Sequence, residues 1–429
     1  MKILIKDVLA ILPGNEILGS EKTNICIDGK NIVAVGDVPI DFTPDKTIEG
    51  RNRLAIPGLI NSHTHSYMAF MRNSADDLPF MDWLFKRIDP IEQQMTDTDA
   101  YWGAMLAMVE MIKSGTTCFN DMHMNINMTA RAAADSGMRA MLSRGLVGTG
   151  RDAGGMRRLD EALKERDEWK SCDRINFSLG PHAPYTCDDE YMRIVADTAK
   201  REHMGIHVHL AESESEITGI NEKYHMTPIE MANENGLFDV RCVAAHCVRL
   251  TENDRKILKN KNVSVVTCPA SNMKLGNGFA NISELLKTGV NVCLGTDGAA
   301  SNNSLNMFRE MNLLSLIHKG VNETPVCVSA EETYASATIN GARALGLDSE
   351  IGLIEKGKRA DIVLLDLKNP SMNPQNNLIS ALSYSANGSE TDTVIIDGEI
   401  VMENRRLLTV NETEVYENVN KIAKRMGMQ

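Results

Sequence analysis

Three features are missing from this sequence, and each absence argues against a class of protein. None of the nine cysteines forms a Cys-x-x-Cys pair, which argues against both a zinc ribbon and a disulfide framework. No cluster of Lys and Arg stands out against the net charge of −13, so an electrostatic surface for nucleic acid is not expected. No apolar run reaches transmembrane length, and the N-terminus lacks the long apolar core of a signal peptide. We therefore expect a cytoplasmic protein with reduced thiols that acts neither on nucleic acid nor in a membrane.

Length and composition are those of a globular protein larger than one ordinary domain. The chain of 429 residues is long enough for a barrel of eight β/α units and a smaller second part. Hydrophobic residues make up 43% of it, which predicts a sizeable buried core.

Both ends of the chain have the pattern of antiparallel β-sheet. Residues 1–56 alternate apolar and polar side chains between turn signals such as Asp28-Gly29. The same pattern returns within residues 351–429, where Asp397-Gly398 marks a hairpin turn before a C-terminal helix. Neither end supplies enough strands for a stable sheet, so we expect the two to combine into one small β-sandwich.

Residues 57–350 alternate strand-like runs with helical stretches such as 101–115, a pattern typical of parallel strands joined by right-handed crossovers. Eight candidate strands can be counted: LAIPGLINSHTH, GTTCFNDM, RAMLSRGL, INFSLGPHAPYTC, GIHVHLAE, CVAAHCV, VSVVTCP and VNVCLGTDG. Eight β/α units predict an α/β fold of the (β/α)8 TIM-barrel type. Its active site should lie at the C-terminal ends of the strands.

Histidines and an aspartate fall at those strand ends. His63 and His65 are two residues apart on a strand, so their side chains point to the same face. His207 and His209 repeat this spacing, and His209 is nearer the open face, whereas His207 lies one layer deeper. Asp297 ends the eighth strand. Three imidazoles and one carboxylate suit a catalytic zinc or another borderline divalent metal, with one position left for water.

Two further residues complete a hydrolytic site. Asp297 is suited to accept a proton from an activated water while it holds the metal. Glu212, three residues after His209, is placed to protonate a ring nitrogen as the adjacent carbon is attacked. His246 ends the next strand and is placed to stabilise charge on the attacking oxygen. The residues alone therefore predict metal-assisted hydrolysis with a separate acid.

These motifs resemble those of a known family. PGLINSHTHS, HLAESESE, AAHCV and GTDGAASNNSLNMF, together with the late GLIEKGKRAD, are similar to the amidohydrolase superfamily over nearly the whole chain. The DGAASNNSL stretch narrows the resemblance to the methylthioadenosine/S-adenosylhomocysteine deaminase group. It implies hydrolytic deamination of 5'-modified adenosines (5'-deoxyadenosine, methylthioadenosine, S-adenosylhomocysteine, adenosine) to the inosine derivative and ammonia. It also implies one divalent metal per subunit, usually zinc, and a homo-oligomer, commonly a tetramer.

The resemblance also implies a role for individual residues. The metal ligands are matched by His63, His65, His209 and Asp297, the acid at purine N1 by Glu212, and the histidine beside the nucleophilic water by His246. The substrate contacts are matched by Glu92 for the ribose hydroxyls, His182 and Ser301 for purine nitrogens, and Arg144 for an amino-acid tail. A second arginine is expected shortly after a Gly-Gly pair; here Gly154-Gly155-Met156 precedes Arg157 and Arg158, which needs a one-residue insertion and leaves both arginines eligible.

Two other functions remain to be separated from deamination. A cyclic amide hydrolase of the hydantoinase or dihydroorotase type has the same barrel but bridges two metals with a lysine on the fourth strand. INFSLGPHAPYTC has no lysine there and offers His182 instead. A non-catalytic barrel scaffold should have lost ligands, whereas this chain retains all of them. The P-C-x-x-C signature of cytidine-type zinc deaminases is absent.

Overall fold

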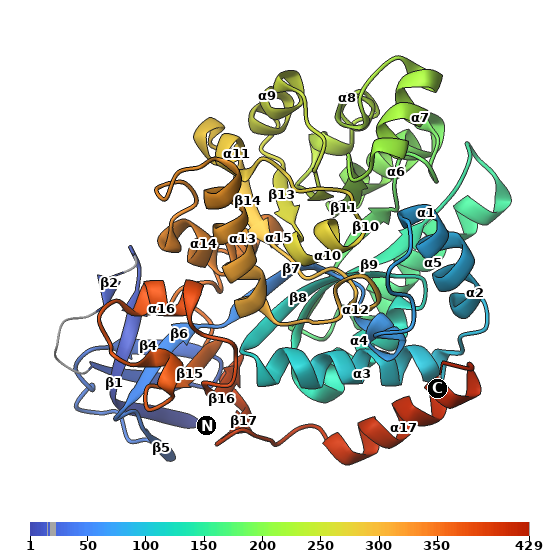
Figure 1. The fold of residues 1–429 in the computed structure, drawn as a ribbon. Helices are drawn as coiled ribbons and strands as arrows, with labels where there is room; N and C mark the ends of the chain where they lie inside the picture. Colours follow the sequence, from blue (N-terminus) through green and yellow to red (C-terminus); the bar gives the residue numbers. More distant parts are fainter. Residues whose placement is uncertain (15, 18–22, 429) are drawn as a thin grey trace.

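The computed structural model describes residues 1–14, 16–17 and 23–428. Its centre is a parallel sheet whose strands pair in chain order (Figure 1). The strands are β7 (Leu59–Thr64), β8 (Thr116–His123), β9 (Arg139–Leu146), β10 (Ile175–Pro181), β11 (Gly205–Leu210), β12 (Cys242–His246), β13 (Ser264–Thr267) and β14 (Asn291–Leu294). The first and last strands approach each other, and Asp297 N donates to His63 O at 2.9 Å just beyond them. The sheet is thus a nearly closed barrel, and the predicted TIM fold is confirmed.

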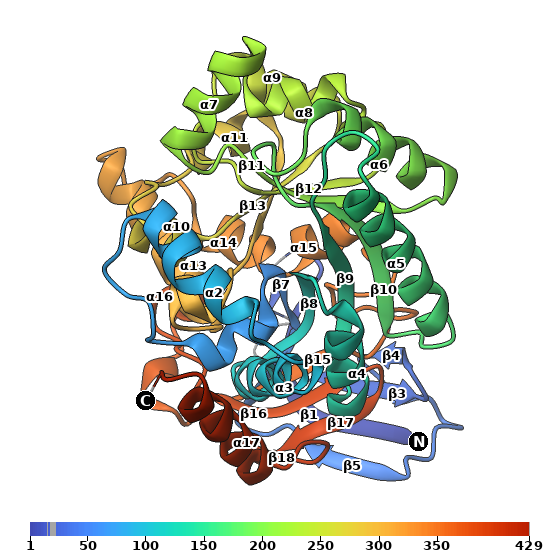
Figure 2. The ribbon, with the colours of Figure 1, turned by 90° about the vertical axis from the view of Figure 1, so that its right-hand side faces the viewer.

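Helices cover the outside of this barrel (Figures 1 and 2). Four of them begin with a reciprocal capping box, at Thr96, Thr227, Thr251 and Ser329, where side chains satisfy backbone groups that a helix start leaves free. The helices of this layer are α3 (Asp97–Lys113), α4 (Ile126–Ser136), α5 (Ala153–Trp169), α6 (Asp189–Arg201), α7 (Glu214–Tyr224), α8 (Pro228–Glu234), α9 (Glu252–Asn260), α10 (Pro269–Lys274), α11 (Ile282–Thr288), α12 (Ala299–Asn302), α13 (Met307–Val321), α14 (Ala330–Ser336) and α15 (Ile339–Leu345).

Both chain ends share a second sheet, which lies below the barrel in Figure 2. Its hydrogen-bonded order is β18-β17-β16-β15-β6-β1-β3-β4, with β2 and β5 paired to β1. The strands are β1 (Lys2–Leu12), β2 (Glu16–Ile17), β3 (Thr23–Asp28), β4 (Asn31–Val35), β5 (Lys46–Glu49), β6 (Arg53–Pro57), β15 (Ile362–Asp366), β16 (Thr391–Ile396), β17 (Glu399–Glu403) and β18 (Arg406–Leu407). The join between the ends is the antiparallel β6–β15 pair. The composite sandwich is confirmed, while the exact division at residues 57 and 351 stays a prediction.

The first predicted barrel strand is in fact two strands. LAIPGLINSHTH divides at Gly58, so that β6 belongs to the second sheet and β7 to the barrel. A side chain at Gly58 would meet Thr117, because a Cβ there would lie 1.9 Å from the Thr117 Oγ1. Continuous apolar character hides this junction in the sequence, since both strands are buried.

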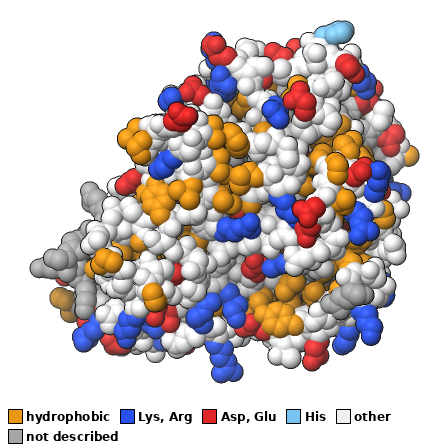
Figure 3. Space-filling model, viewed as in Figure 1, with side chains coloured by type: hydrophobic (Ala, Val, Ile, Leu, Met, Phe, Trp, Pro, Cys, Tyr) orange, Lys and Arg blue, Asp and Glu red, His pale blue; other side chains and the backbone are white. Residues whose placement is uncertain are grey.

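Helices α16 and α17 follow the barrel in the chain. α16 (Leu378–Tyr384) contacts α13 and α14, and α17 (Glu412–Arg425) runs along α3. None of the described helices combines the length and apolar character needed to cross a bilayer. Figure 3 shows acidic and basic side chains interspersed over one face, without a continuous basic field.

A buried ion cluster joins the barrel to the second sheet. Arg139 begins β9, and only 1% of its side chain is exposed. Its Nε and one Nη donate to Asp361 at 2.9 and 3.1 Å, and the same Nη donates to Asp397 at 3.1 Å. Asp361 directly precedes β15, and Asp397 directly follows β16. One barrel cation therefore bridges two carboxylates of the C-terminal strands, and Asp397 also lies 3.6 Å from Lys30 Nζ and 3.4 Å from an Nη of Arg359.

Replacing Arg139 should destabilise the protein more than the loss of any surface ion pair would. Arg139→Met leaves two carboxylates in a buried position, and breaking a buried pair from one side typically costs about 3–5 kcal/mol. Urea unfolding would measure this loss against Lys256→Met, which removes an exposed helical pair with Glu252 and should change little. Equal unfolding midpoints for the two variants would contradict a structural role for the cluster.

Candidate active site

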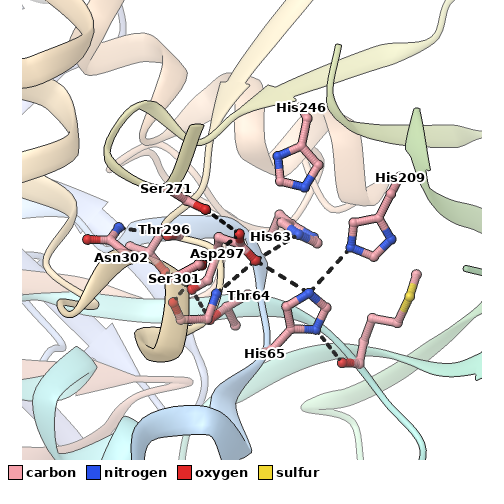
Figure 4. Close-up of polar contacts among 12 residues, drawn as sticks. His63, Thr64, His65, His209, His246, Ser271, Thr296, Asp297, Ser301 and Asn302 are labelled. Atoms are coloured by element: carbon pink, nitrogen blue, oxygen red, sulfur yellow. Dashed lines mark hydrogen bonds and ion pairs between the residues drawn. The ribbon is translucent and has the colours of Figure 1, made fainter. Parts of the chain in front are cut away.

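The predicted metal ligands meet at the C-terminal mouth of the barrel (Figure 4). His63 lies on β7, His65 follows its end, His209 lies on β11, and Asp297 follows β14. Asp297 Oδ1 is 3.4 Å from Nε2 of both His63 and His65, and His65 Nε2 is 3.3 Å from His209 Nε2. These separations suit atoms that share one cation rather than direct hydrogen bonds between neutral rings.

Each of the three imidazoles is oriented by a hydrogen bond from Nδ1, the nitrogen that faces away from the metal position. His65 Nδ1 donates to Met122 O at 2.7 Å, and His209 Nδ1 donates to His182 O at 2.8 Å. A carbonyl only accepts, so Nδ1 carries the hydrogen in both rings and Nε2 presents a lone pair to the centre. Carbonyl partners of this kind are typical supports of metal-binding histidines.

His63 is oriented through a longer relay. Its Nδ1 is 2.8 Å from His207 Nε2, and His207 Nδ1 is 2.9 Å from Ser143 Oγ. Ser143 Oγ donates its hydrogen to Asp121 O, so it must accept a hydrogen from His207 Nδ1. His207 Nε2 is then unprotonated and accepts a hydrogen from His63 Nδ1. His63 Nε2 is left as a buried lone pair without a hydrogen-bond partner. An orphaned acceptor in this position fits a divalent cation.

Burial sets the protonation states of the ligands. It lowers the pKa of His63 to about 4 and that of His209 well below its usual value, so both rings are neutral at pH 7. Burial acts to raise the pKa of Asp297, but the adjacent His63 and the other neighbouring imidazoles outweigh it and hold that pKa well below its usual range. Neutral imidazoles and an ionised carboxylate are the forms that bind metal.

Asp297 is fixed on its other side by hydroxyl and amide donors. Its Oδ2 accepts from Ser271 Oγ at 2.6 Å and Ser301 Oγ at 2.9 Å, while Gly298 N donates to Oδ1 at 2.8 Å. The residue has a φ of 61°, and His246 also has a positive φ, of 72°. Two non-glycine residues in the left-handed region at one site indicate backbone strain held by the surrounding structure.

Glu212 and His246 stand beside the ligand set. Glu212 Oε2 is 3.8 Å from His246 Nε2, and Glu212 Oε1 accepts from Asn277 Nδ2 at 2.9 Å. Burial raises the pKa of Glu212, which favours its protonated, acid form. Burial acts to lower the pKa of His246, but the charges of Glu212 and Asp297 outweigh it and raise that pKa. The pair can therefore hold a proton next to the metal position.

A pocket of about 230 Å³ opens above these residues. Its inner wall includes His65, His182, Glu212 and Asp297, and a further wall carries Glu92, which accepts from Tyr67 Oη. The 3₁₀ segment η1 (Ser66–Met71), the π-helical segment η2 (Trp83–Ile88) and α2 (Asp89–Glu92) supply much of the remaining lining.

Three of the predicted substrate residues do not line this pocket. Ser301 donates from Oγ to Asp297 Oδ2 and is not part of the pocket lining. Arg144 donates to Met124 O and to the carboxylates of Glu161 and Glu165. Arg157 is a surface residue with 69% of its side chain exposed. Glu92 and His182 do line the pocket, and their contacts with substrate stay predictions.

His123 and Tyr67 line the pocket but were not identified as site residues from the sequence. His123 is the last residue of β8 and stacks on Tyr67, with ring centroids 3.4 Å apart. The candidate strand GTTCFNDM stops one residue before His123, so the strand-end rule that found the other histidines would have found this one. Tyr67 lies in a connecting segment, where strand periodicity gives no signal.

Residues 54–401 match the amidohydrolase family. The chain belongs to that family. It is 45% identical over 428 residues to a 5-methylthioadenosine/S-adenosylhomocysteine deaminase of Thermoanaerobacter pseudethanolicus, covering 99% of both chains. It is 44% identical over 416 residues to a 5'-deoxyadenosine deaminase of Methanocaldococcus jannaschii, covering 96% of this chain and 98% of the relative. A crystal structure of an adenosine deaminase from Xanthomonas campestris with bound zinc superimposes with a TM-score of 0.94 at 32% identity, covering 100% and 99% of the two chains.

The His207 relay should control metal affinity. His207→Leu removes the acceptor of His63 Nδ1, and loss of such an outer partner typically weakens metal binding about 10–100-fold. Competition with a chelator, followed by elemental analysis, would measure the change. His225→Asn alters an exposed histidine at a helix end and serves as the control. Unchanged affinity in His207→Leu would contradict the relay.

Proposed function

We propose that this amidohydrolase family member deaminates the adenine ring of 5'-modified adenosines, giving the inosine derivative and ammonia. The observation that carries this proposal is a buried acid with a raised pKa, Glu212, beside two overlapping groups of possible metal ligands: His63, His209 and His246, and His63, His65 and Asp297. Ring deamination needs an activated water at one atom and a proton at its neighbour, and this arrangement offers both. The names of the similar deaminases support the same reaction.

One divalent ion, zinc in our proposal, would be held by His63, His65, His209 and Asp297. When bound, such an ion supplies an acidified water as the nucleophile. The three neutral Nε2 lone pairs and the ionised carboxylate fit it, and the zinc-bound structural neighbour supports this metal.

The residues of the chain divide the proton transfers between them. Asp297 accepts the proton of the attacking water and later delivers it to the departing amino group. Glu212 protonates N1 of the ring through Oε2, because Oε1 is engaged by Asn277. His246 donates from Nε2 to the oxygen that attacks C6, while its Nδ1 is oriented by Asn272 Oδ1 at 2.9 Å.

Substrate orientation would come from the pocket wall. Glu92 is placed to accept from the ribose hydroxyls, and His182 is placed against the purine ring, oriented by Thr186 Oγ1 at 2.9 Å from its Nδ1. Ser301 would act on the purine through its hold on Asp297. We further propose a cytoplasmic location, as the sequence pattern predicts, and a homotetramer, as the resemblance implies; sedimentation at working concentration would test the assembly.

Metal-loaded protein should deaminate at least one of four nucleosides: S-adenosylhomocysteine, methylthioadenosine, 5'-deoxyadenosine and adenosine. The loss of adenine absorbance on conversion to hypoxanthine measures the rate. Dihydrouracil tests the cyclic amide alternative. Ring opening of dihydrouracil without any nucleoside turnover would overturn the proposed function.

Asp297→Asn should abolish turnover and still permit nucleoside binding. The variant keeps the shape and removes the base, so calorimetric binding with absent activity is expected. Retained activity would exclude Asp297 as the base.

Glu212→Gln should lower kcat by about 10²–10⁴-fold, the range typical of a lost general acid. Glu214→Gln is the matched control, because Glu214 lies two residues on with 73% of its side chain exposed. Similar rates in the two variants would show that N1 receives its proton elsewhere.

A further inference from the structure

The acid Glu212 follows a strained turn of the backbone. β11 ends at Leu210, and Ala211 then has a φ of 52°, in the left-handed region that non-glycine residues rarely adopt. His246 and Cys247, after the start of the same kind of turn beyond β12, have φ values of 72° and 47°. Strain of this kind persists only where surrounding contacts hold it. The contacts that hold Ala211 therefore also decide where Glu212 points.

A second carboxylate, that of Glu216, makes those contacts. Its Oε1 accepts from Ala211 N at 2.9 Å, and its Oε2 accepts from Glu212 N at 2.8 Å. Successive backbone N–H groups that point at one anion form a nest, an arrangement that a turn of this kind provides. Both oxygens of Glu216 are thus engaged by the turn that carries the acid.

Glu216 departs from an ordinary capping box. It is the third residue of α7, and its backbone N donates to the N-cap Ser213 Oγ at 3.2 Å. In a capping box the side chain of the third residue returns a bond to the N-cap N–H, as Glu332 does at Ser329 before α14. Glu216 instead reaches past Ser213 and ties the start of the helix to the backbone of Glu212.

The position of Glu216 is costly for a carboxylate. Only 3% of the residue is exposed, and burial raises its pKa to about 7. Glu332, at the equivalent position of α14, is exposed. Helix capping does not require burial, so it does not explain this cost. The contact with the turn does.

The turn also connects the acid to the neighbouring strand end. Arg249 lies three residues after His246, and Arg249 N donates to Ala211 O at 2.9 Å. Ala211 is therefore held from two sides, by Glu216 at its N–H and by the loop after β12 at its carbonyl. This arrangement fixes Glu212 relative to His246.

We propose that Glu216 is a positioning residue: its carboxylate holds the turn of Ala211 and Glu212, and so aims the Glu212 side chain at the ring nitrogen. Glu216 is not among the described residues that line the pocket, and it acts through Glu212 alone. This role rests on the proposed deaminase function and adds a residue to it.

Glu216→Gln tests this role in the metal-loaded protein. The amide has nearly the same size but one acceptor oxygen, so one of the two N–H groups loses its partner. For whichever of the four nucleosides is turned over fastest, kcat should fall at least about tenfold, a part of the about 10²–10⁴-fold expected for the acid itself. KM should change less than about threefold. Glu332→Gln alters the equivalent cap carboxylate of α14 and should leave both constants unchanged.

A double-mutant cycle with Glu212→Gln separates positioning from a general structural defect. Because Glu216 acts through Glu212, replacing Glu216 in the Glu212→Gln protein should lower the rate further by less than about twofold. Single-turnover measurements with enzyme in excess reach the low rates involved. An equal fall in both backgrounds would overturn the role, because a general defect does not depend on Glu212.

Glu216→Asp is the second variant, for the case that Glu216→Gln does not fold. It keeps a carboxylate at the start of α7 but is one methylene too short to reach both N–H groups, so a similar loss of kcat is expected. Near-UV circular dichroism and metal content establish folding. Full activity in either folded variant would overturn the positioning role and leave the deaminase in place. No turnover of any adenine nucleoside by the unmodified protein would overturn the proposed function, and this role with it.

Discussion

The site depends on one constraint. The Nδ1 atoms of three histidines are all hydrogen-bonded, so their Nε2 lone pairs must point toward the same place. Nδ1 of His65 and of His209 donates to a backbone carbonyl, and Nδ1 of His63 donates to His207. Lone pairs gathered away from water repel unless they share an electrophile. A bound cation would relieve this repulsion at the C-terminal end of the barrel. Metal binding and folding are therefore coupled there.

The two sheets serve this constraint in different ways. The barrel aligns the strand ends, and contact across the closing seam is made by Asp297 N and His63 O, which are both ligand residues. The second sheet contributes no ligand, but it anchors β9 through Arg139 and so steadies the strand that carries Ser143 of the relay. A ligand set drawn from three separate strands is only as well placed as the barrel that aligns them.

The strands and the histidine pair were predicted from the sequence because apolar runs and a two-residue spacing are visible in it. Apolar runs marked the eight strands, and the spacing of two residues between His63 and His65 placed both on one face. Partners contributed by backbone carbonyls, such as Met122 O, leave no trace in side-chain patterns. The break at Gly58 and the side chain of Tyr67 depend on contacts with residues far along the chain, Thr117 and His123. The positive φ values at His246 and Asp297 are likewise set by tertiary contacts rather than by local preference.

Chemistry and selection come from different parts of the chain. Strand ends supply the metal position, the acid and the base. Strands β8 to β13 are each paired on both sides, and β7 and β14 meet across the seam through Asp297 N and His63 O. The segments η1, η2 and α2 between β7 and α3, with Trp83 and Glu92, supply much of the pocket wall. Because these segments supply none of the metal ligands, a substitution in them would change the pocket wall and leave the hydrolytic centre in place.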